Sequence, residues 1–323
     1  MQMNRCCKLF AFFWFALSLA SATADEYPNR PVRLIVGFSA GGNADTPTRI
    51  VANKLGELWG SSIVVENRPG AGGNIAADIA AKASPDGYTL ILCNSASHAI
   101  NPALYKKITF DPIKDFAAIS QIGSSPNVLL IHASVQATTV SEFIAIAKAN
   151  PGKISVGSAG VGTSQHLSLE MLKFLTGADL LHVPYKGGIP ALSDLLGGQI
   201  PAMVAGIPTA LPALKGGKVR ALGVTSATRS PQLPTLAAIG ESVPGFDVTS
   251  WLGLCAPSGV SETILTKLNT DLVTVLNMPD IRERLAEHGI DAMPTTREQF
   301  DTFIKTEIVK WAKIIKEARL TSD

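Results

Sequence analysis

The chain repeatedly alternates short runs of β-branched residues with stretches of helical periodicity. Runs at 32–38 (VRLIVGF), 62–68 (SIVVENR) and 89–94 (TLILCN) each precede a helical pattern, and the rhythm resumes at 127–132 (NVLLIH) and continues to 219–226 (VRALGVTS). Such alternation is typical of βαβ units, in which parallel strands are joined by helices. We therefore expect an α/β protein, and the two sets of strands fit two sheets better than one.

The pattern of the last part of the sequence indicates that the chain returns to the first predicted domain. An extended run, VTSWLGLCAP, is followed by three helical patterns without a new set of strands. We infer two crossovers between the domains, near Ser125 and Trp251. The predicted first domain comprises 25–125 plus 251–323, and the predicted second domain comprises 126–250.

The first 24 residues have the pattern of a secretory signal. Arg5 and Lys8 precede the continuous apolar run 9–20, and Ala22-Thr23-Ala24 supplies an A-x-A cleavage site. The run is too short to span a bilayer comfortably. We therefore predict export to the periplasm as a soluble protein.

Charge and cysteine content narrow the function classes. Without 1–24, the chain has 26 basic and 26 acidic residues, a balance that offers no attraction for nucleic acid. Cys93 and Cys255 could form a disulfide in an oxidising compartment, but both lie in apolar strand-like runs. Buried thiols are the favoured interpretation.

A glycine-rich turn directly follows the first predicted strand and allows three interpretations. Gly37 to Gly41 (GFSAG) matches the G-x-S-x-G turn of serine hydrolases, with Ser39 as nucleophile. However, no earlier strand precedes it to supply the second oxyanion donor. A dinucleotide site is disfavoured because Gly37, Gly41 and Gly42 do not have the G-x-G-x-x-G spacing. The third interpretation is an anion site at a helix N-terminus.

A second turn of the same kind favours the anion site. The segment 158–164 (SAGVGTS) follows the predicted strand ISVGS and opens another helix, in the other predicted domain. Each turn would offer free backbone N–H groups, hydroxyl groups and the positive end of a helix dipole. Two such turns facing each other across a cleft could grip a small carboxylate without an arginine. The alternative is that both are merely glycine-rich helix starts.

Other candidate residues carry weaker signals. Asn94 and Ser95 end the third strand and could line the same cleft, whereas Asp45 in the first helical turn could cap it or orient water or a ligand hydroxyl. His166 and His182 lack metal-ligand spacing and are expected to be satisfied near-surface residues, not metal ligands. We expect no metal, no other cofactor and no catalytic residue.

Almost the whole chain after the signal resembles a known family, the Bug-type (TctC-like) solute-binding proteins of tripartite tricarboxylate transport systems. The resemblance is carried by YPNRPVRLIVGFSAGGNAD, VVENRPGAGGNIAADIAAKASPDGYTL, SAGVGTSQHLSLEML, HVPYKGGIPALSDLLGGQI and GKVRALGVTSATRSPQLPTL. It implies a two-domain periplasmic binding protein fold (type II-like), with mostly parallel sheets flanked by helices. It also implies closure on a carboxylate that is passed to membrane permease subunits. We expect the receptor to act as a monomer.

The resemblance places the ligand at the same two turns. The expected ligand-binding residues are Phe38, Ser39, Ala40, Gly41, Gly42, Asp45, Asn94, Ser95, Ser158, Ala159, Gly160, Gly162, Thr163 and Ser164. Many relatives have an Asp-Asn pair where this chain has Ala205-Gly206. With Ile207 and Pro208 adjacent, this predicts an apolar wall suited to a carboxylate with an apolar or aromatic body. The alternative function is a secreted serine hydrolase that uses Ser39.

Overall fold

The computed structural model describes residues 27–317 and 320–321, so the predicted signal peptide lies outside the described residues. The strands are β1 (Val32–Val36), β2 (Ile63–Asn67), β3 (Thr89–Asn94), β4 (Phe116–His132), β5 (Ile154–Ser158), β6 (Leu180–Pro184), β7 (Ala202–Gly206), β8 (Val219–Val224), β9 (Thr249–Pro257) and β10 (Asp291–Ala292). The helices are α1 (Asp45–Trp59), α2 (Asn74–Ala81), α3 (Asn101–Leu104), α4 (Val140–Ala149), α5 (Ser164–Thr176), α6 (Gly188–Leu196), α7 (Ile207–Leu214), α8 (Glu262–Leu276), α9 (Pro279–Glu287) and α10 (Arg297–Glu317). Short turns are η1 (Ala71–Gly73), the π-helical η2 (Ala96–Ile100) and η3 (Ile239–Glu241).

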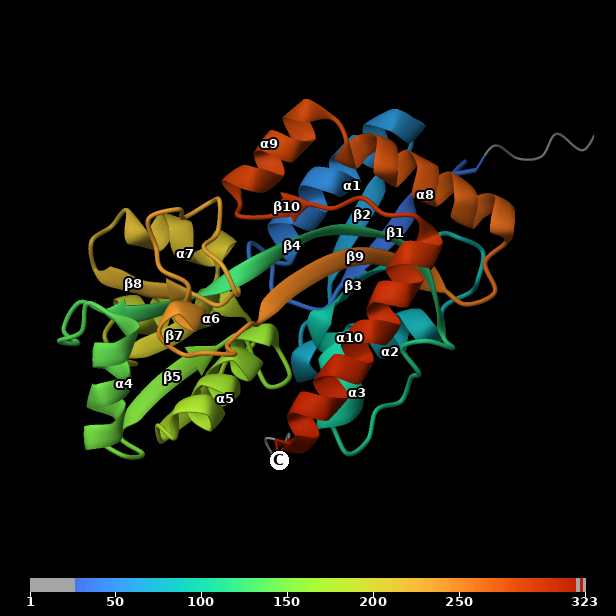
Figure 1. The fold of residues 1–323 in the computed structure, drawn as a ribbon. Coiled ribbons are helices and arrows are strands. Elements are labelled where there is room, and N and C mark those ends of the chain that lie inside the picture. Colours follow the sequence, from blue (N-terminus) through green and yellow to red (C-terminus); the bar gives the residue numbers. More distant parts are fainter. Residues whose placement is uncertain (1–26, 318–319, 322–323) are drawn as a thin grey trace, which may run out of the picture.

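The described strands are connected in the order β2-β1-β3-β9-β4-β7-β5-β6, with β8 and β10 also pairing with β4. Two groups of strands form two lobes (Figure 1). The first lobe contains β1, β2, β3, β9, β10 and the start of β4, and the second contains β5 to β8 and the end of β4. The α/β architecture confirms the predicted class of fold.

Two strands carry the chain between the lobes. From Phe116 to Pro126, β4 pairs with β9, and from Asn127 to His132 it pairs with β7 and β8 instead. The expected crossovers near Ser125 and Trp251 fall on β4 and β9 (Figure 1). The exact domain boundaries stay a prediction.

The described strands form one continuous mixed sheet, because β4 pairs in both lobes, whereas the sequence predicts two sheets, each mostly parallel. Strand β1 is parallel to β2 and β3, and β5 is parallel to β6 and β7, as the βαβ pattern predicts. The pairs β3–β9, β4–β9, β4–β7 and β4–β8 are antiparallel. The antiparallel pairs arise because the two crossing strands run in opposite directions between the lobes.

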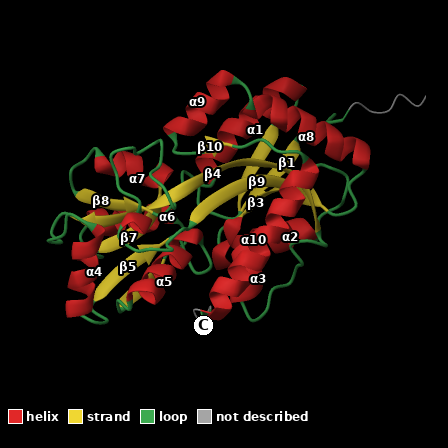
Figure 2. Cartoon of the chain, viewed as in Figure 1, coloured by secondary structure: helices red, strands yellow, loops and turns green. Residues whose placement is uncertain are grey.

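Helices cover both faces of the first lobe's sheet (Figure 2). The side chains of β1 alternate between two cores: Val32, Leu34 and Val36 join the cluster that contains α1 and α8, while Ile35 joins the cluster that contains α2 and α10. This is the reason that the run is apolar at nearly every position, since a strand buried on both faces has no exposed side. Packing on both faces fixes β1, and its carboxyl end leads directly into the loop that follows it.

Cys93 and Cys255 form a disulfide, contrary to the expectation of buried thiols. Their Cα atoms are 5.8 Å apart, and they lie on the neighbouring antiparallel strands β3 and β9. The sequence separation of 162 residues concealed this pairing, because nothing local in the sequence places β9 beside β3. The bond links β9 covalently to β3 within the first lobe.

Helix α10 is fixed to the first lobe by aromatic packing and one buried acid. Trp251 packs edge-on against Phe300 and Phe303 of α10. The carboxylate of Glu307 accepts hydrogen bonds from the indole N–H groups of Trp251 (3.2 Å) and Trp311 (3.1 Å). Both indoles are almost fully buried, so Glu307 satisfies two donors that water cannot reach.

We predict that Glu307→Leu lowers the free energy of unfolding by about 2–5 kcal/mol, because two buried indole donors lose their acceptor. Glu307→Gln keeps an acceptor oxygen and should lose less than half of that. Urea unfolding of both variants and of Asp301→Ala, which removes only an exposed pair with Lys305, is the measurement. A Leu variant no less stable than Asp301→Ala would contradict the assigned role.

Reducing the disulfide should lower the free energy of unfolding by about 3–5 kcal/mol, because it releases a long loop in the unfolded chain. Peptide mapping by mass spectrometry should find Cys93 and Cys255 in one cross-linked fragment, and urea unfolding with and without reductant gives the stability difference. Alkylation of both thiols in the unfolded but unreduced protein would show that the bond is absent.

Candidate functional site

The first loop, residues 37–44, connects β1 to α1 and turns sharply at its glycines. Gly41 has a left-handed φ of 76°, a conformation that glycine adopts without steric strain. The amide of Asn67, at the end of β2, donates to the carbonyl of Phe38 (2.9 Å). The loop is therefore fixed by the neighbouring strand as well as by its own glycines.

Asp45 shapes this loop, and its carboxylate is engaged within the first lobe. It is 2% exposed and accepts hydrogen bonds from the Gly41 N–H (2.9 Å), Arg49 Nε (2.9 Å) and Asn67 Nδ2 (2.8 Å). Burial raises the pKa of Asp45, but the hydrogen bonds from Arg49, Gly41 and Asn67 outweigh it and lower the pKa overall. The carboxylate thus remains ionised, with its charge directed toward Arg49. Of the two roles that the sequence leaves open for Asp45, these hydrogen bonds favour one at the start of the helix over orienting water or a ligand hydroxyl.

The second loop, residues 159–163, connects β5 to α5 in the other lobe. Gly160 and Gly162 have left-handed φ values of 130° and 81°. The hydroxyl of Thr163 donates to the Gly160 carbonyl (2.7 Å) and accepts from the His166 N–H (3.3 Å), which makes it the N-cap of α5. Ser158 accepts from the Gly160 N–H (3.1 Å), so hydroxyl groups fix both ends of the loop.

Two stacked histidines support the second loop from behind. The rings of His166 and His182 lie 4.1 Å apart between centroids. His166 Nδ1 accepts from the Gly162 N–H (3.2 Å), and His182 Nε2 contacts the hydroxyl of Ser158 (2.7 Å). Burial lowers the pKa of His166 to about 3 and that of His182 to about 4. Both rings are therefore neutral, structural groups near pH 7. His166 is only 5% exposed, which is deeper than the near-surface position that the sequence predicts.

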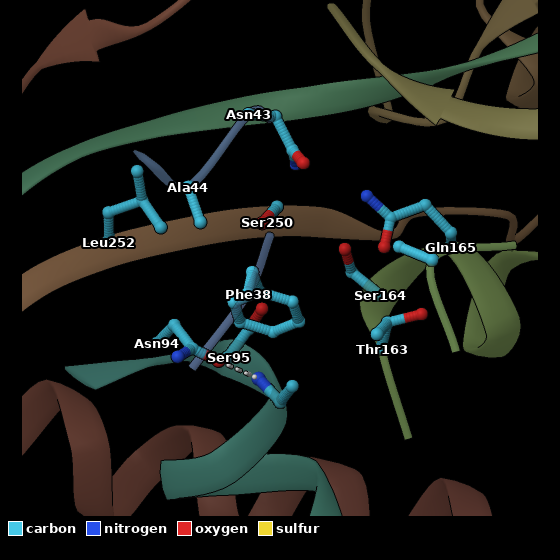
Figure 3. A pocket seen from close by; sticks show the side chains of 12 residues that line it. Phe38, Asn43, Ala44, Asn94, Ser95, Thr163, Ser164, Gln165, Ser250 and Leu252 are labelled. Carbon is cyan, nitrogen blue, oxygen red and sulfur yellow. Dashed lines mark hydrogen bonds between the residues drawn. The ribbon is translucent and has the colours of Figure 1, made fainter. Parts of the chain in front are cut away.

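One cavity lies between the two loops (Figure 3). Its volume is about 20 Å³, room for roughly one water. It is lined by Phe38, Asn43, Ala44, Asn94, Ser95, Ala96, Ala159, Thr163, Ser164, Gln165, Ser250 and Leu252. Every lining residue is uncharged, so a bound anion would meet backbone N–H groups, hydroxyls and amides.

The structure brings six of the fourteen predicted site residues to this cavity. They are Phe38, Asn94, Ser95, Ala159, Thr163 and Ser164. The other eight lie in or beside the two loops without lining it: Ser39, Ala40, Gly41, Gly42, Asp45, Ser158, Gly160 and Gly162. Asn94 also caps the turn below the cavity, because its side-chain oxygen accepts the N–H groups of Ala96 (2.9 Å) and Ser97 (3.2 Å).

Sequence reasoning missed the other lining residues for identifiable reasons. Asn43 and Gln165 stand in or next to the two motifs, yet single amides belong to no recognisable pattern. Ser250 and Leu252 come from β9, which reaches the cavity through antiparallel pairing with β3 and β4. Their only signal is the extended run that contains them.

The predicted apolar wall does not line the cavity. A Cβ atom on Gly206 would lie 2.5 Å from Nδ2 of Asn43, so the Asn43 side chain occupies the space above this glycine. Ala205 and Ile207 are instead buried in the core of the second lobe. The missing side chain at Gly206 thus makes room for a polar amide from the opposite lobe.

The lobes are in direct contact around the cavity. Ser39 donates its hydroxyl proton to the carbonyl of Lys186 (2.6 Å), and Tyr105 donates to the carbonyl of Val161 (3.3 Å). A second cavity of about 250 Å³ lies at the same junction and shares Phe38 and Ala159 with the first. These contacts and the small volume of the first cavity show that the two lobes lie close together. The lobes must separate to admit a carboxylate.

Two searches of the described residues bear on other function classes. Within 27–317 and 320–321, no three His, Cys, Asp or Glu side chains are grouped so as to hold a metal ion. In the same part of the chain, no helix has the length and apolar character needed to cross a membrane. The Ser39 hydroxyl donates to a carbonyl and not to a histidine, so its geometry gives the hydrolase alternative no support.

We predict that the free energy of unfolding falls as the pH falls from about 6.5 to 4.5. Burial lowers the pKa of His98 to about 3, as it does for His166, so the unfolded chain binds protons that the folded chain excludes. Each such site lowers stability by about 1.4 kcal/mol per pH unit below about pH 6.5. Urea unfolding at several pH values should show this slope. His98→Leu removes one such site and should reduce the slope by about 1.4 kcal/mol per pH unit. A flat profile would refute the burial of neutral rings.

Known proteins with the same fold and similar sequence include two that were solved with a carboxylate. Residues 48–320 match the profile of the family described as tripartite tricarboxylate transporter family receptor. A Rhodopseudomonas palustris protein solved with adipate is 36% identical, with a TM-score of 0.89 over 92% of this chain and 99% of its own. MatC from Rhodopseudomonas palustris, solved with malate, is 33% identical, with a TM-score of 0.85 over 90% and 100%. The periplasmic binding protein BugD is 34% identical, with a TM-score of 0.87 over 91% and 99%.

These similarities extend over the whole described fold and not over an isolated motif. They confirm a two-domain binding-protein architecture, and the relatives are solute-binding proteins, not enzymes. The periplasmic location of such receptors agrees with the predicted export. The chain belongs to the tripartite tricarboxylate transporter receptor family, as a Bug-type, TctC-like solute-binding protein.

Proposed function

We propose that this protein is a periplasmic receptor that captures one small organic carboxylate between the first and second loops and delivers it to a tripartite permease. The observation that carries the proposal is an uncharged cavity lined by residues of two glycine-rich strand-to-helix loops from opposite lobes. The adipate and malate in the related structures support the ligand class. The receptor acts as a monomer in this proposal.

The two loops supply what a carboxylate needs. They precede α1 and α5, whose 15 and 13 residues orient their dipoles with the positive ends toward the loops. Backbone N–H groups at a helix start have no partner within the helix and can bind an anion. Each hydrogen bond to a charged group contributes about 1.5–3 kcal/mol net, so a few of them give about micromolar affinity after ordering costs.

The position of the cavity between the lobes explains why ligand binding would favour the closed state. A carboxylate that contacts both loops interacts better with the closed lobes than with separated ones, and this difference is what shifts the population toward closure. The contacts from Ser39 to Lys186 and from Tyr105 to Val161 join the same lobes beside the ligand. The closed receptor would be the form that the permease subunits recognise.

The test is a thermal-shift screen of the purified protein against small mono- and dicarboxylates, followed by calorimetry of the binders. A ligand at about a hundred times its Kd should raise the free energy of unfolding by about 2.7 kcal/mol. Thr163→Ala should lower affinity about tenfold, because it removes the cap that fixes the second loop.

Thr139→Ala is the matched control, since Thr139 caps α4 in the same lobe outside the cavity. Both variants should lose about 1 kcal/mol of stability, but only Thr163→Ala should lose affinity. Equal affinities for the two variants, or no carboxylate that shifts the melting temperature, would count against the proposal.

A further inference from the structure

Two amide side chains face the cavity from opposite lobes without a hydrogen-bonding partner. Asn43 projects from the first loop, and Gln165 projects from the first turn of α5; their amide ends point toward the space between them (Figure 3). Gln165 is only 3% exposed. Within the described part of the chain, neither amide donates or accepts a side-chain hydrogen bond.

Several polar groups near these amides are already engaged in other hydrogen bonds. Thr163 bonds to the Gly160 carbonyl, the Ser164 hydroxyl accepts from Asn127, and the oxygen of Asn94 accepts two backbone N–H groups. An amide withdrawn from water without a new partner disfavours the closed state. A ligand bound between the lobes is in a position to supply the missing partners for Asn43 and Gln165.

The amides define which ligand group fits. Each amide offers both an N–H₂ donor and a carbonyl acceptor, and a hydroxyl is the small group that donates and accepts at once. An ammonium would lack an anionic partner, because no carboxylate lines the cavity and Asp45, after the first loop, already binds Gly41, Arg49 and Asn67. An apolar body would leave both amides unsatisfied.

We propose that Asn43 and Gln165 determine specificity by selecting carboxylates that carry a hydroxyl group on the carbon chain. The inference rests on the proposed function, since the carboxylate itself is gripped by the two loops. It replaces the apolar-bodied ligand expected from Ala205 and Gly206, because the Asn43 amide lies over Gly206 and faces the cavity. Asn43 lies in one lobe and Gln165 in the other, so both amides can bind the ligand's hydroxyl group only when the lobes are closed.

The experiment is calorimetry with three matched pairs that differ by one hydroxyl: lactate and propanoate, 3-hydroxybutanoate and butanoate, malate and succinate. Wild-type protein should bind the hydroxylated member of at least one pair at least tenfold more tightly. Gln165→Met keeps the length of the side chain and Asn43→Ala removes the other amide. Each should reduce the preference about tenfold, mainly by weakening the hydroxylated ligand.

Gln136→Met is the control, because the Gln136 amide lies outside the cavity and donates to the Ser134 carbonyl. It should retain the wild-type preference, and thermal unfolding verifies that all variants fold. Equal binding within every pair, or variants that weaken both members equally, would overturn the inference and leave the proposed function intact. Binding of no carboxylate in the panel would overturn both.

Discussion

The antiparallel pairing of β4 with β9 is the constraint on which the rest of the molecule depends. Strand β4 belongs to both lobes, because its pairing changes from β9 to β7 and β8 after Pro126. Strand β9 starts beside this change and brings Ser250 and Leu252 to the base of the cavity. The two loops can face each other only because these strands hold the carboxyl ends of β1 and β5 toward the same junction. The cavity is thus a consequence of topology, and the loops supply its chemistry.

How much the sequence predicts depends on whether the signal is local. The two glycine-rich turns are local signals, since strand, turn and helix follow one another directly, and both turns border the cavity. The pairing of Cys93 with Cys255 is not local, because it depends on a strand that returns from the second lobe. Gln165 marks a third case: its position is next to a recognised motif, but only the surrounding hydrogen bonds reveal that its amide is unpaired.

Asp45 illustrates how a charged residue can serve a neutral site. Its carboxylate fixes the first loop through the Gly41 N–H, while Arg49 offsets its charge. A loop fixed before the ligand arrives loses little conformational freedom on binding, and this preorganisation favours affinity. The sequence left open whether Asp45 caps the helix or orients water or a ligand hydroxyl, and its hydrogen bonds favour support of the first loop.

A cavity without charged residues also determines what kind of recognition is available. Fixed dipoles and hydrogen-bond donors act more strongly in a closed, low-dielectric site than in water, so helix starts can balance one carboxylate. A second full charge would find no cationic side chain among the lining residues, only neutral donors. Selectivity must therefore come from the geometry of neutral groups. Because His166 and His182 are buried as neutral rings, the second loop does not depend on their protonation near pH 7. Recognition of the ligand by Asn43 and Gln165 therefore depends on closure of the lobes and not on the charge of these histidines.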